Sequence, residues 1–355
     1  METLNVTDWD PCISDDVNTI AADENKVFIG GAFMSINGAP RGSAAAVDLN
    51  TCDILPWNPE IDGSVLAIQA NENSVYLGGD FSCLTDPTKN NLLAVDPETG
   101  VLQEWTGGAN DLVYTMVLAE DCLYTGGYFT RTGGSNRTHI ASLDPETGNA
   151  LPWNPGANEL VTSFCLNDQT LYAGGWFSAI GGNTRIRLAA FDTSTGLLLP
   201  WNPQSSEVVT EIKYFDSSIF VCGGFDSIAG IPKSSIARID PDSGTPLPFE
   251  IFPSINSFVR SISMSDNIIY FGGDFTEAGG LTHSYLANAD ISTGEILPWN
   301  PSPYLHNELL TINPADIYEI IPIGNSLLVA GEFDAVGGKV RMNLAAINKY
   351  TGEAY

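Results

Sequence analysis

The sequence predicts an all-β repeat fold: a seven-bladed β-propeller with four antiparallel strands in each blade. Three observations support this. A tryptophan, a Gly-Gly-x-Phe phrase and an aspartate that opens a turn each recur along the 355 residues with a period of about 48. Independent columns at one period are typical of short units that stack side by side and share their cores with neighbours.

The tryptophan column contains six of the seven tryptophans in the chain. Its members are Trp9, Trp57, Trp105, Trp153, Trp201 and Trp299, and Phe249 takes the place between the last two. Several stand in the phrase LPWNP, where the prolines mark the end of an outer strand. A ring needed at every repeat indicates packing against the neighbouring sheet rather than a single ligand site.

The other two columns place the remaining strands of each unit. The phenylalanines are Phe33, Phe81, Phe129, Phe177, Phe225, Phe275 and Phe333, and the turns open at Asp48, Asp96, Asp144, Asp192, Asp240, Asp290 and Asn348. In the second unit, residues 65–68, 75–81 and 91–96 alternate as strands do, and a last strand reaches Trp105. The aspartate is expected to accept backbone N–H groups and cap its turn.

The chain ends suggest how a ring would close. The last unit stops at Tyr355, before its own tryptophan, whereas the chain begins with LNVTDWDP. Residues 1–11 are therefore expected to supply the outermost strand of the seventh blade. Closure removes exposed sheet edges, so residues 1–355 are interpreted as one propeller domain.

A fourth column is basic and uses six of the fourteen Lys and Arg residues of the chain. Its members are Arg41, Lys89, Arg137, Arg185, Lys233, His283 and Arg341. One interpretation is a cationic ring that binds anions. The other, which the recurrence favours, is architectural: an ion pair between blades, or a cation stacked on the recurring tryptophan.

Composition limits the class of partner. The net charge of −29 argues against nucleic acid, because phosphate binding requires clustered cations. No apolar run is long enough for membrane insertion, and no signal peptide is visible. The acidic surface suits an extracellular or cell-surface location. The six cysteines show no metal-binding spacing, so neither a metal nor a cofactor is expected; one or two disulfides and buried free thiols both stay open.

The repeated phrase GGxF…R…LAxxD…TG…W resembles the delta-60-type repeats found in secreted bacterial proteins, over essentially the whole chain. That resemblance implies the propeller fold and no particular chemistry. Residues 188–201, LAAFDTSTGLLLPW, are also similar to the tryptophan-docking motif of quinoprotein dehydrogenases. There the indole locks one blade onto the next, which implies the same packing role for Trp201.

Function is expected where one unit departs from the others. The interval after Trp299 is about ten residues longer than its counterparts and carries Tyr304, His306, Asn307 and Glu308. These side chains can hydrogen-bond and stack on a sugar, or hold a peptide. The alternative is a longer loop without a ligand.

The inner strands supply a second group, just after their first residues. Glu211, Arg260, Tyr318 and Glu319 are polar where other units are not, and the three charged groups are predicted to meet across blades 5, 6 and 7. Two carboxylates there suit glycosidase chemistry, whereas a compensating Glu–Arg–Glu network needs no substrate.

The sequence therefore favours a non-enzymatic, extracellular binding or adhesion module, with a glycan or protein ligand on the face that carries residues 300–316. The first alternative is a carbohydrate-active enzyme, a lyase or glycosidase, working near Glu211 and Glu319. The second alternative is a structural subunit of a surface assembly.

Overall fold

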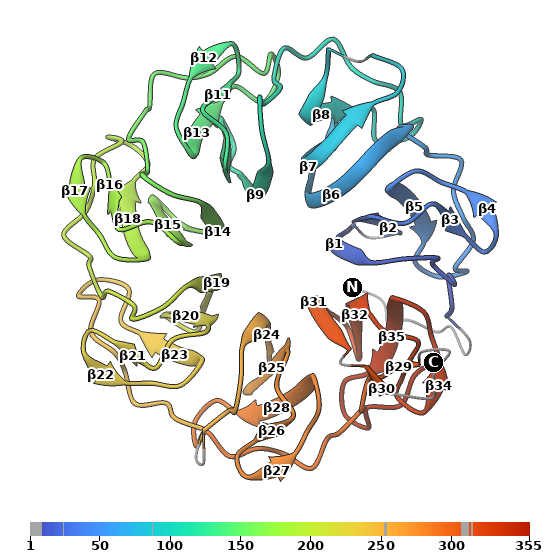
Figure 1. Cartoon of the computed structure of the whole chain (residues 1–355), viewed down its shortest axis with the longest axis vertical. Coiled ribbons are helices and arrows are strands. Elements are labelled where there is room, and N and C mark those ends of the chain that lie inside the picture. The colour runs from blue at the N-terminus through green and yellow to red at the C-terminus, as the bar shows by residue number, and fades with distance from the viewer. Residues whose placement is uncertain (1–8, 24, 87, 252–253, 307–311, 314) are drawn as a thin grey trace. The chain divides into compact units, whose positions relative to one another are not determined.

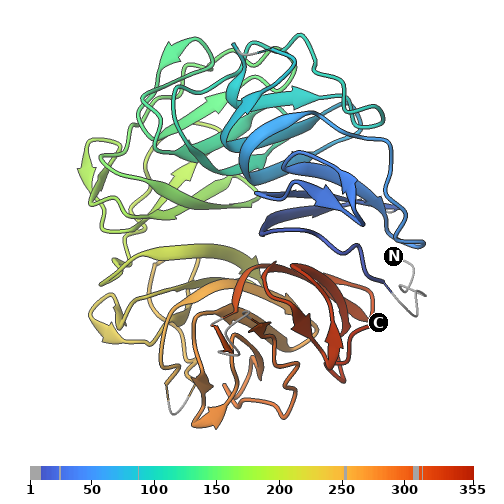
Figure 2. The same cartoon turned by 45° about the vertical axis from the view of Figure 1, so that its right-hand side comes forward.

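The computed structural model describes residues 9–23, 25–86, 88–251, 254–306, 312–313 and 315–355. Throughout this part of the chain the regular structure is β-strand, without a helix (Figures 1 and 2). Two compact units are present. Unit 1 is Met1–Asn58 with Phe249–Tyr355, and unit 2 is Pro59–Pro248.

Unit 1 contains three antiparallel sheets of three strands among its described residues. They are β1 (Val17–Ala22), β2 (Lys26–Gly31) and β5 (Ala44–Asp48); β24 (Val259–Ser265), β25 (Ile268–Gly273) and β28 (Leu286–Asp290); and β31 (Asp316–Ile323), β32 (Ser326–Glu332) and β35 (Leu344–Asn348). Short two-stranded ribbons accompany them: β3 (Ser35–Ile36) with β4 (Ala39–Pro40), β26 (Glu277–Ala278) with β27 (Leu281–Thr282), β29 (Leu305–His306) with β30 (Ile312–Asn313), and β33 (Ala335–Val336) with β34 (Lys339–Val340).

Unit 2 repeats the pattern four times in its described residues. Its sheets are β6 (Ile61–Ala70), β7 (Val75–Cys83) and β8 (Asn90–Val95); β9 (Val113–Leu118), β10 (Leu123–Gly127) and β13 (Ile140–Leu143); β14 (Val161–Asn167), β15 (Thr170–Gly175) and β18 (Leu188–Asp192); and β19 (Val209–Phe215), β20 (Ser218–Gly223) and β23 (Ile236–Ile239). Its ribbons are β11 (Arg131–Thr132) with β12 (Ser135–Asn136), β16 (Ala179–Ile180) with β17 (Asn183–Thr184), and β21 (Ser227–Ile228) with β22 (Ile231–Pro232).

The predicted fourth strand is much shorter than expected. The outer segment meets its sheet through one isolated bridge, such as Val47 with Ile54 or Phe191 with Leu198. One backbone hydrogen bond follows, for example from Leu199 N to Ala190 O at 2.8 Å. The next residue there is Pro200, which has no N–H to continue the ladder, but the pairing is equally short in the second repeat, where Glu104 takes that place.

The Gly-Gly phrase is required by the close approach of two strands. A Cβ on Gly79 would lie 2.0 Å from the Ser64 carbonyl oxygen across the hairpin. A Cβ on Gly126 would lie 2.9 Å from Val161 Cγ1, on the following sheet. Glycine thus brings both the hairpin partner and the next sheet into contact.

Each turn aspartate caps its turn. Asp144 Oδ1 accepts hydrogen bonds from Glu146 N and Thr147 N at 2.9 and 2.8 Å. The backbone hydrogen bond from Thr147 lowers the pKa of Asp144 below its usual value. The capped turn then presents its own carbonyl groups to the preceding sheet.

The recurring tryptophans bind these turns within each unit. Indole Nε1 of Trp105 donates to Pro145 O at 3.1 Å, that of Trp201 to Asp240 O at 3.1 Å, and that of Trp299 to Asn348 O at 3.4 Å. The three indoles are at most 5% exposed, so each carries a large apolar area into the joint between two sheets.

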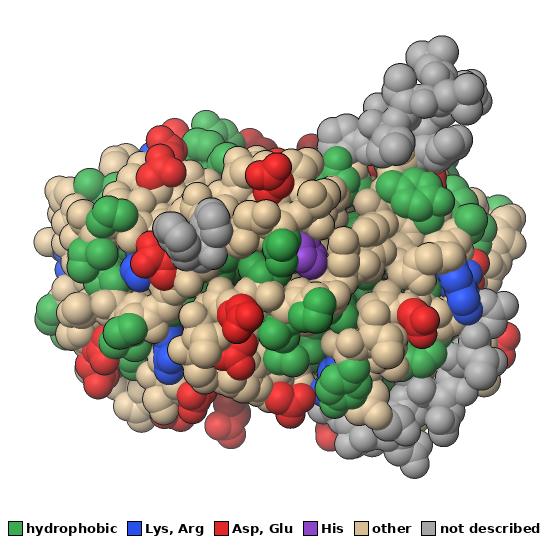
Figure 3. All heavy atoms as spheres, turned by 90° about the horizontal axis from the view of Figure 1, so that it is seen from below, with side chains coloured by type: hydrophobic (Ala, Val, Ile, Leu, Met, Phe, Trp, Pro, Cys, Tyr) green, Lys and Arg blue, Asp and Glu red, His purple; other side chains and the backbone are tan. Residues whose placement is uncertain are grey.

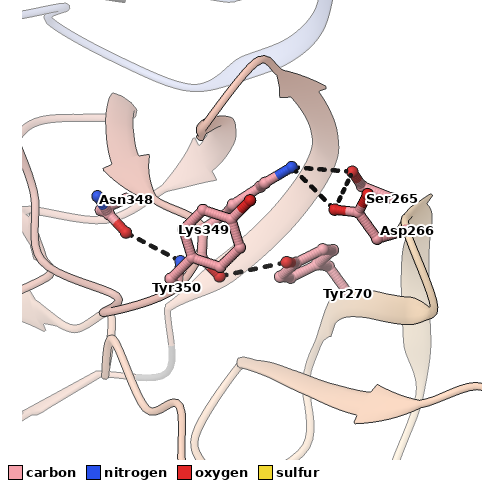
Figure 4. A network of polar contacts seen from close by, with 6 residues as sticks. All are labelled: Ser265, Asp266, Tyr270, Asn348, Lys349 and Tyr350. Carbon is pink, nitrogen blue, oxygen red and sulfur yellow. Dashed lines mark hydrogen bonds and ion pairs between the residues drawn. The ribbon is translucent and has the colours of Figure 1, made fainter. Parts of the chain in front are cut away.

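A polar network adds to one such joint in unit 1 (Figure 4). Lys349 Nζ, from the turn after β35, donates to Ser265 Oγ at 3.2 Å and to Asp266 Oδ2 at 3.1 Å, both beside β24. The hydroxyl of Tyr270 in β25 donates to Lys349 O at 3.2 Å. The turn after β35 therefore both donates hydrogen bonds to the β24–β25 hairpin and accepts one from it.

Three arginines of the basic column donate to a backbone carbonyl of the outer segment, whereas Arg341 also forms an ion pair with Asp10 Oδ2 at 3.3 Å. Arg185 Nη2 donates to Leu199 O at 2.9 Å, and Arg137 Nη2 donates to Leu151 O at 2.6 Å. Arg41 makes the equivalent bond to Leu55 O at 3.3 Å. These guanidinium groups satisfy carbonyls of the outer segment, next to the proline that follows each leucine.

Trp9 is fully buried among side chains of the first and last sheets, including Val47, Leu49, Leu328 and Leu344. Residues 1–8 lie outside the described residues, so the closing strand and the seven-bladed ring stay predictions. The six cysteines all carry free thiols, and four of these thiols are buried. Of the two predicted states, disulfides and buried free thiols, the second agrees with the structure.

Truncation of one buried tryptophan should open its joint. Trp201→Ala removes an indole that is 2% exposed together with its hydrogen bond to Asp240 O. We expect the free energy of unfolding to fall by about 3–5 kcal/mol, measured by urea denaturation.

The matched control is Trp176→Ala, because Trp176 lies outside the column and is 47% exposed. Its stability should change by less than about 1 kcal/mol. Equal losses for the two variants would contradict the packing role of the column.

Candidate functional site

The residues predicted from the long interval after Trp299 are only partly described. Tyr304 is exposed, and its backbone bridges Ala335, a contact shifted by one residue from the corresponding bridges of other repeats, such as Ala157 with Ile180. His306 lies in β29, and its side chain is outside the described residues; Asn307 and Glu308 lie entirely outside them. The structure also contains a short hairpin, in which β29 pairs with β30. Two residues separate this hairpin from Asp316, where β31 begins.

The two glutamates predicted at the inner strands have partners close by. Glu211 Oε1 lies 2.8 Å from Lys213 Nζ on the same strand in unit 2. Glu319 Oε2 in unit 1 accepts a hydrogen bond from Ile20 N at 2.6 Å, which connects β31 to β1. Glu319 therefore satisfies a backbone donor between two sheets.

Arg260 and Tyr318 occupy the same irregularity in neighbouring sheets. The strand register shifts between Val259 and Ser261, and again between Ile317 and Glu319. The residue inside each shift is the extra residue of a β-bulge, a feature that redirects a side chain near a strand end. The bulges direct Arg260 and Tyr318 together: the guanidinium lies 6.0 Å from the centre of the Tyr318 ring.

Arg260 binds two carboxylates in the described structure, and both differ from the predicted glutamates. Its Nε and Nη2 donate to Asp274 Oδ1 and Oδ2 at 2.9 and 3.1 Å, a two-point contact of the kind arginine makes best. Nε also lies 2.8 Å from Asp316 Oδ1. The single hydrogen on Nε is directed at Asp274, so the approach to Asp316 is an ion pair without a hydrogen bond.

The carboxylates outnumber this cation. Burial raises the pKa of Asp316 to about 7, against the opposing effect of Arg260. Burial, with repulsion from Glu332 and Asp15, raises the pKa of Asp16 to about 6. Near neutral pH the cluster therefore holds protons that ordinary aspartates would have lost.

We call this group the charged edge: Asp16, Arg260, Asp274, Asp316, Tyr318 and Glu332. It occupies the end of each unit 1 sheet where the first strand begins and the second strand ends. Sequence reasoning found Arg260 and Tyr318 but missed the four acids. The signal was present, because Asp16 and Asp316 stand where the other repeats have Ser64, Leu112, Leu160, Val208 and Phe258.

Two of the four corresponding strand ends in unit 2 carry exposed aromatic rings. Tyr128 and Trp176, at the variable position of Gly-Gly-x-Phe, are 49% and 47% exposed. Tyr128 stacks on His139 with 5.2 Å between ring centres, and the Arg187 guanidinium lies 5.7 Å from the Trp176 ring centre. Trp176 is the seventh tryptophan, and its position outside the column was the signal that sequence reasoning did not use.

A metal site and a membrane-spanning helix are both absent from the described residues. Within the described ranges, no group of three or more His, Cys, Asp or Glu side chains is placed to hold a metal ion. Nor does that part of the chain contain a helix long and apolar enough to cross a bilayer. The charged edge can instead recognise a ligand through ion pairs and hydrogen bonds.

The sheets and their repetition define a class of protein, the β-propellers, and solved structures agree. The WD40 β-propeller domain of Doa1 has a TM-score of 0.58 at 12% identity, covering 92% of this chain and 93% of that one. The computationally designed Ika8 protein gives 0.58 at 14% identity, over 91% and 95% of the two chains. The WD40 repeats of RRP9 give 0.55 at 11% identity, over 84% and 83%.

These similarities show a propeller-type repeat fold and do not distinguish the delta-60 type. No family model matches the chain, and no curated protein matches it.

The buried carboxyl of Asp316 should make stability depend on pH. Its folded-state pKa, about 7, lies above the 3.8 of a free aspartate, so the folded protein binds more protons between those values. The free energy of unfolding should therefore fall as pH rises through that interval. Asp316→Asn should make the fall less steep, measured by denaturation at several pH values.

Asp62→Asn, an exposed carboxyl in unit 2, is the control and should keep the wild-type slope. If Asp316→Asn also retained that slope, the raised pKa would be refuted.

Proposed function

We propose that this chain is a non-enzymatic interaction module that binds a basic segment of a protein partner at the charged edge of unit 1. The observation that carries the proposal is the replacement of the repeat's uncharged strand-end residues by Asp16 and Asp316. Four carboxylates and one guanidinium gather where the other repeats place mostly apolar groups. A lysine or arginine from a partner would meet acids that the single Arg260 does not neutralise.

The long interval after Trp299 supports the same location. Two residues separate the hairpin β29–β30 from Asp316, so a ligand at the charged edge would also meet this added segment. The sequence-based proposal of a ligand at residues 300–316 and the charged edge thus refer to neighbouring parts of unit 1.

The general surface is compatible with a protein partner. Figure 3 shows acidic side chains spread among neutral ones, with Lys and Arg sparse, on one face of the molecule. The exposed Trp176 and Tyr128 and the half-buried Arg187 of unit 2 are of the types that dominate binding energy in protein interfaces. An extracellular or cell-surface location belongs to this proposal and rests on the acidic composition.

Ring closure is part of the same proposal. Asp10 Oδ2 lies 3.3 Å from Arg341 Nη1, and Asn343 Nδ2 donates to Ile13 O at 3.0 Å. Together with the buried Trp9, these contacts support residues 1–11 as the outer segment of the last sheet, and with it a closed seven-bladed ring.

Removal of residues 1–11 tests the closure. The truncated chain should unfold at lower urea concentration, with a loss of about 3 kcal/mol or more, because the buried Trp9 indole is lost. Removal of residues 1–5 alone is the control and should cost much less. If the chain without residues 1–11 were as stable as the full chain, closure by this segment would be contradicted.

The binding proposal is tested with charged peptides on the full chain. We expect a Lys/Gly peptide to bind, measured by calorimetry, and a Glu/Gly peptide of equal length not to bind. The double variant Asp16→Asn/Asp316→Asn should weaken binding of the basic peptide about tenfold, equivalent to ~1.4 kcal/mol.

A charge-matched control separates this site from general attraction to an acidic protein. Glu98→Gln/Glu146→Gln removes two exposed carboxylates from turns of unit 2 and should change the affinity less than about twofold. Equal losses in the two double variants would overturn the charged edge as the site. Release of product from oligosaccharides would instead support the carbohydrate-active enzyme.

A further inference from the structure

The residue before the recurring phenylalanine differs from one repeat to the next and places one side chain on each sheet of unit 2. In chain order these residues are Asp80, Tyr128, Trp176 and Gly224, from four consecutive sheets (Figure 1). We call them the variable row. The other repeats have Ala32, Asp274 and Glu332 at this place, so the two aromatic rings stand in consecutive repeats.

The first three members of the variable row are equivalently placed, because each sheet packs on the next in the same way. Two residues before each member is a glycine, and the first valine of the next sheet lies against it. The distances from a Cβ built on the glycine to the valine Cγ1 are 2.7 Å for Gly78 and Val113, 2.9 Å for Gly126 and Val161, and 2.9 Å for Gly174 and Val209. Sheets that pack face to face lie about 10 Å apart, so neighbouring members of the row stand about 10 Å from each other.

The ring of Trp176 is held from one side. The guanidinium carbon of Arg187 lies 5.7 Å from the ring centre. This guanidinium is itself fixed, since Nη1 donates to Trp176 O at 2.8 Å and Nη2 lies 3.6 Å from Glu207 Oε2. Trp176 is nevertheless 47% exposed, so a flat apolar surface is presented in a defined position.

The ring of Tyr128 is held in a similar way. It stacks on the imidazole of His139, with 5.2 Å between ring centres and 26° between planes. His139 Nδ1 lies 2.9 Å from Ala157 O, which fixes the imidazole. Tyr128 is 49% exposed. Rings that are already held in place lose little conformational freedom when a ligand binds them.

The surface between the two rings is apolar. Trp176 N donates to Leu160 O at 2.8 Å, and Leu160 directly precedes the valine that packs on the glycine before Tyr128. Tyr128 N donates to Leu112 O at 2.8 Å in the same manner. Both leucines are half-buried, so part of each side chain contributes to this surface.

Exposed acids flank the rings. Asp80 is the member of the variable row one sheet before Tyr128, and it is exposed. Asp111 and Glu159, each directly before one of the two leucines, are exposed as well. Charge complementarity therefore favours a ligand that combines apolar rings with a positive charge.

The spacing of the row fits one backbone conformation of such a ligand. A polyproline II helix completes a turn in three residues and advances about 9 Å in doing so, close to the separation of neighbouring row members. Prolines three residues apart then point to the same side. In an extended strand, residues three apart point to opposite faces, so a strand could not place both on the rings. Proline-rich segments in this conformation dock on surfaces lined with aromatic rings.

We propose that the variable row of unit 2 binds a proline-rich segment of a partner protein in the polyproline II conformation. One proline packs on Tyr128 and a second, one turn away, packs on Trp176. A lysine or arginine one turn away on the other side meets Asp80. This site requires prolines and lies in unit 2, whereas the charged edge lies in unit 1 and requires positive charge, so either proposal can fail without the other.

The first experiment measures binding of the peptide Lys-Ala-Ala-Pro-Ala-Ala-Pro, and of the same peptide in reverse order, to the full chain by calorimetry. Two control peptides have the same charge: one has alanine for both prolines, and one has the prolines two residues apart. We expect one of the two test peptides to bind at least about tenfold more tightly than either control, because only three-residue spacing places a proline on each ring. Equal affinity for test and control peptides would overturn the proposal.

Variants then place the site. Trp176→Ala and Tyr128→Ala should each weaken binding of the test peptide about tenfold, because each removes a ring that a proline covers. Asp80→Asn should weaken binding about twofold and reduce its dependence on salt. The matched control is Tyr214→Ala, because Tyr214 is also exposed, at 37%, but lies near the opposite end of its strand β19. That variant should bind as the wild type does.

Thermal melting identifies any variant that fails to fold. Wild-type affinity in folded Trp176→Ala, or in Tyr128→Ala if the first does not fold, would contradict the assignment. The charged-edge variant Asp16→Asn/Asp316→Asn should retain affinity for the test peptide; a loss there, with none in Trp176→Ala, would place the peptide at the charged edge and overturn the proposal. Tighter binding of cellohexaose than of the test peptide, lost in Trp176→Ala, would identify a glycan site and overturn it as well.

Discussion

The indole of one sheet packed on the capped turn of the next is the contact on which the repeated structure depends. Trp105, Trp201 and Trp299 each bury a large ring and donate one hydrogen bond to a turn carbonyl. A three-stranded sheet exposes two apolar faces and cannot be stable alone, so each sheet needs this contact with its neighbour. The turn aspartate, the glycine pair and the proline-flanked tryptophan recur because all serve the same joint.

Residues that take no part in this contact between sheets differ from one repeat to the next. The charged edge, the proposed protein-binding site, consists of such residues. The strand ends beside the β-bulges carry acids in unit 1, whereas two of the four in unit 2 carry exposed aromatic rings, although the backbone hydrogen bonds are equivalent. The joint at Trp153 differs from the others within the contact itself. There Phe191 stands where most other repeats have an aliphatic residue, and its buried ring packs edge-on against that of Trp153.

Much of this architecture could be predicted from residue spacing. The strands, the capped turns and the packing of the tryptophan column follow from the period, since each residue acts within its own repeat or on the next. The predicted fourth strand was too long, since its pairing ends after one bridge and one hydrogen bond, both before Pro200 and before Glu104 of the second repeat. Arg260 and Tyr318 were identified as departures, yet Arg260 binds Asp274 and Asp316 instead of the predicted glutamates.

The sequence by itself determined an all-β repeat and the contacts between its neighbouring sheets. The reason is that residues recurring at one period have to make equivalent contacts in every repeat, and few folds allow this. Tertiary structure alone decided which departures act together. Asp16 and Asp316 are 300 residues apart in the chain, and their proton affinities depend on burial and on neighbours that only folding supplies.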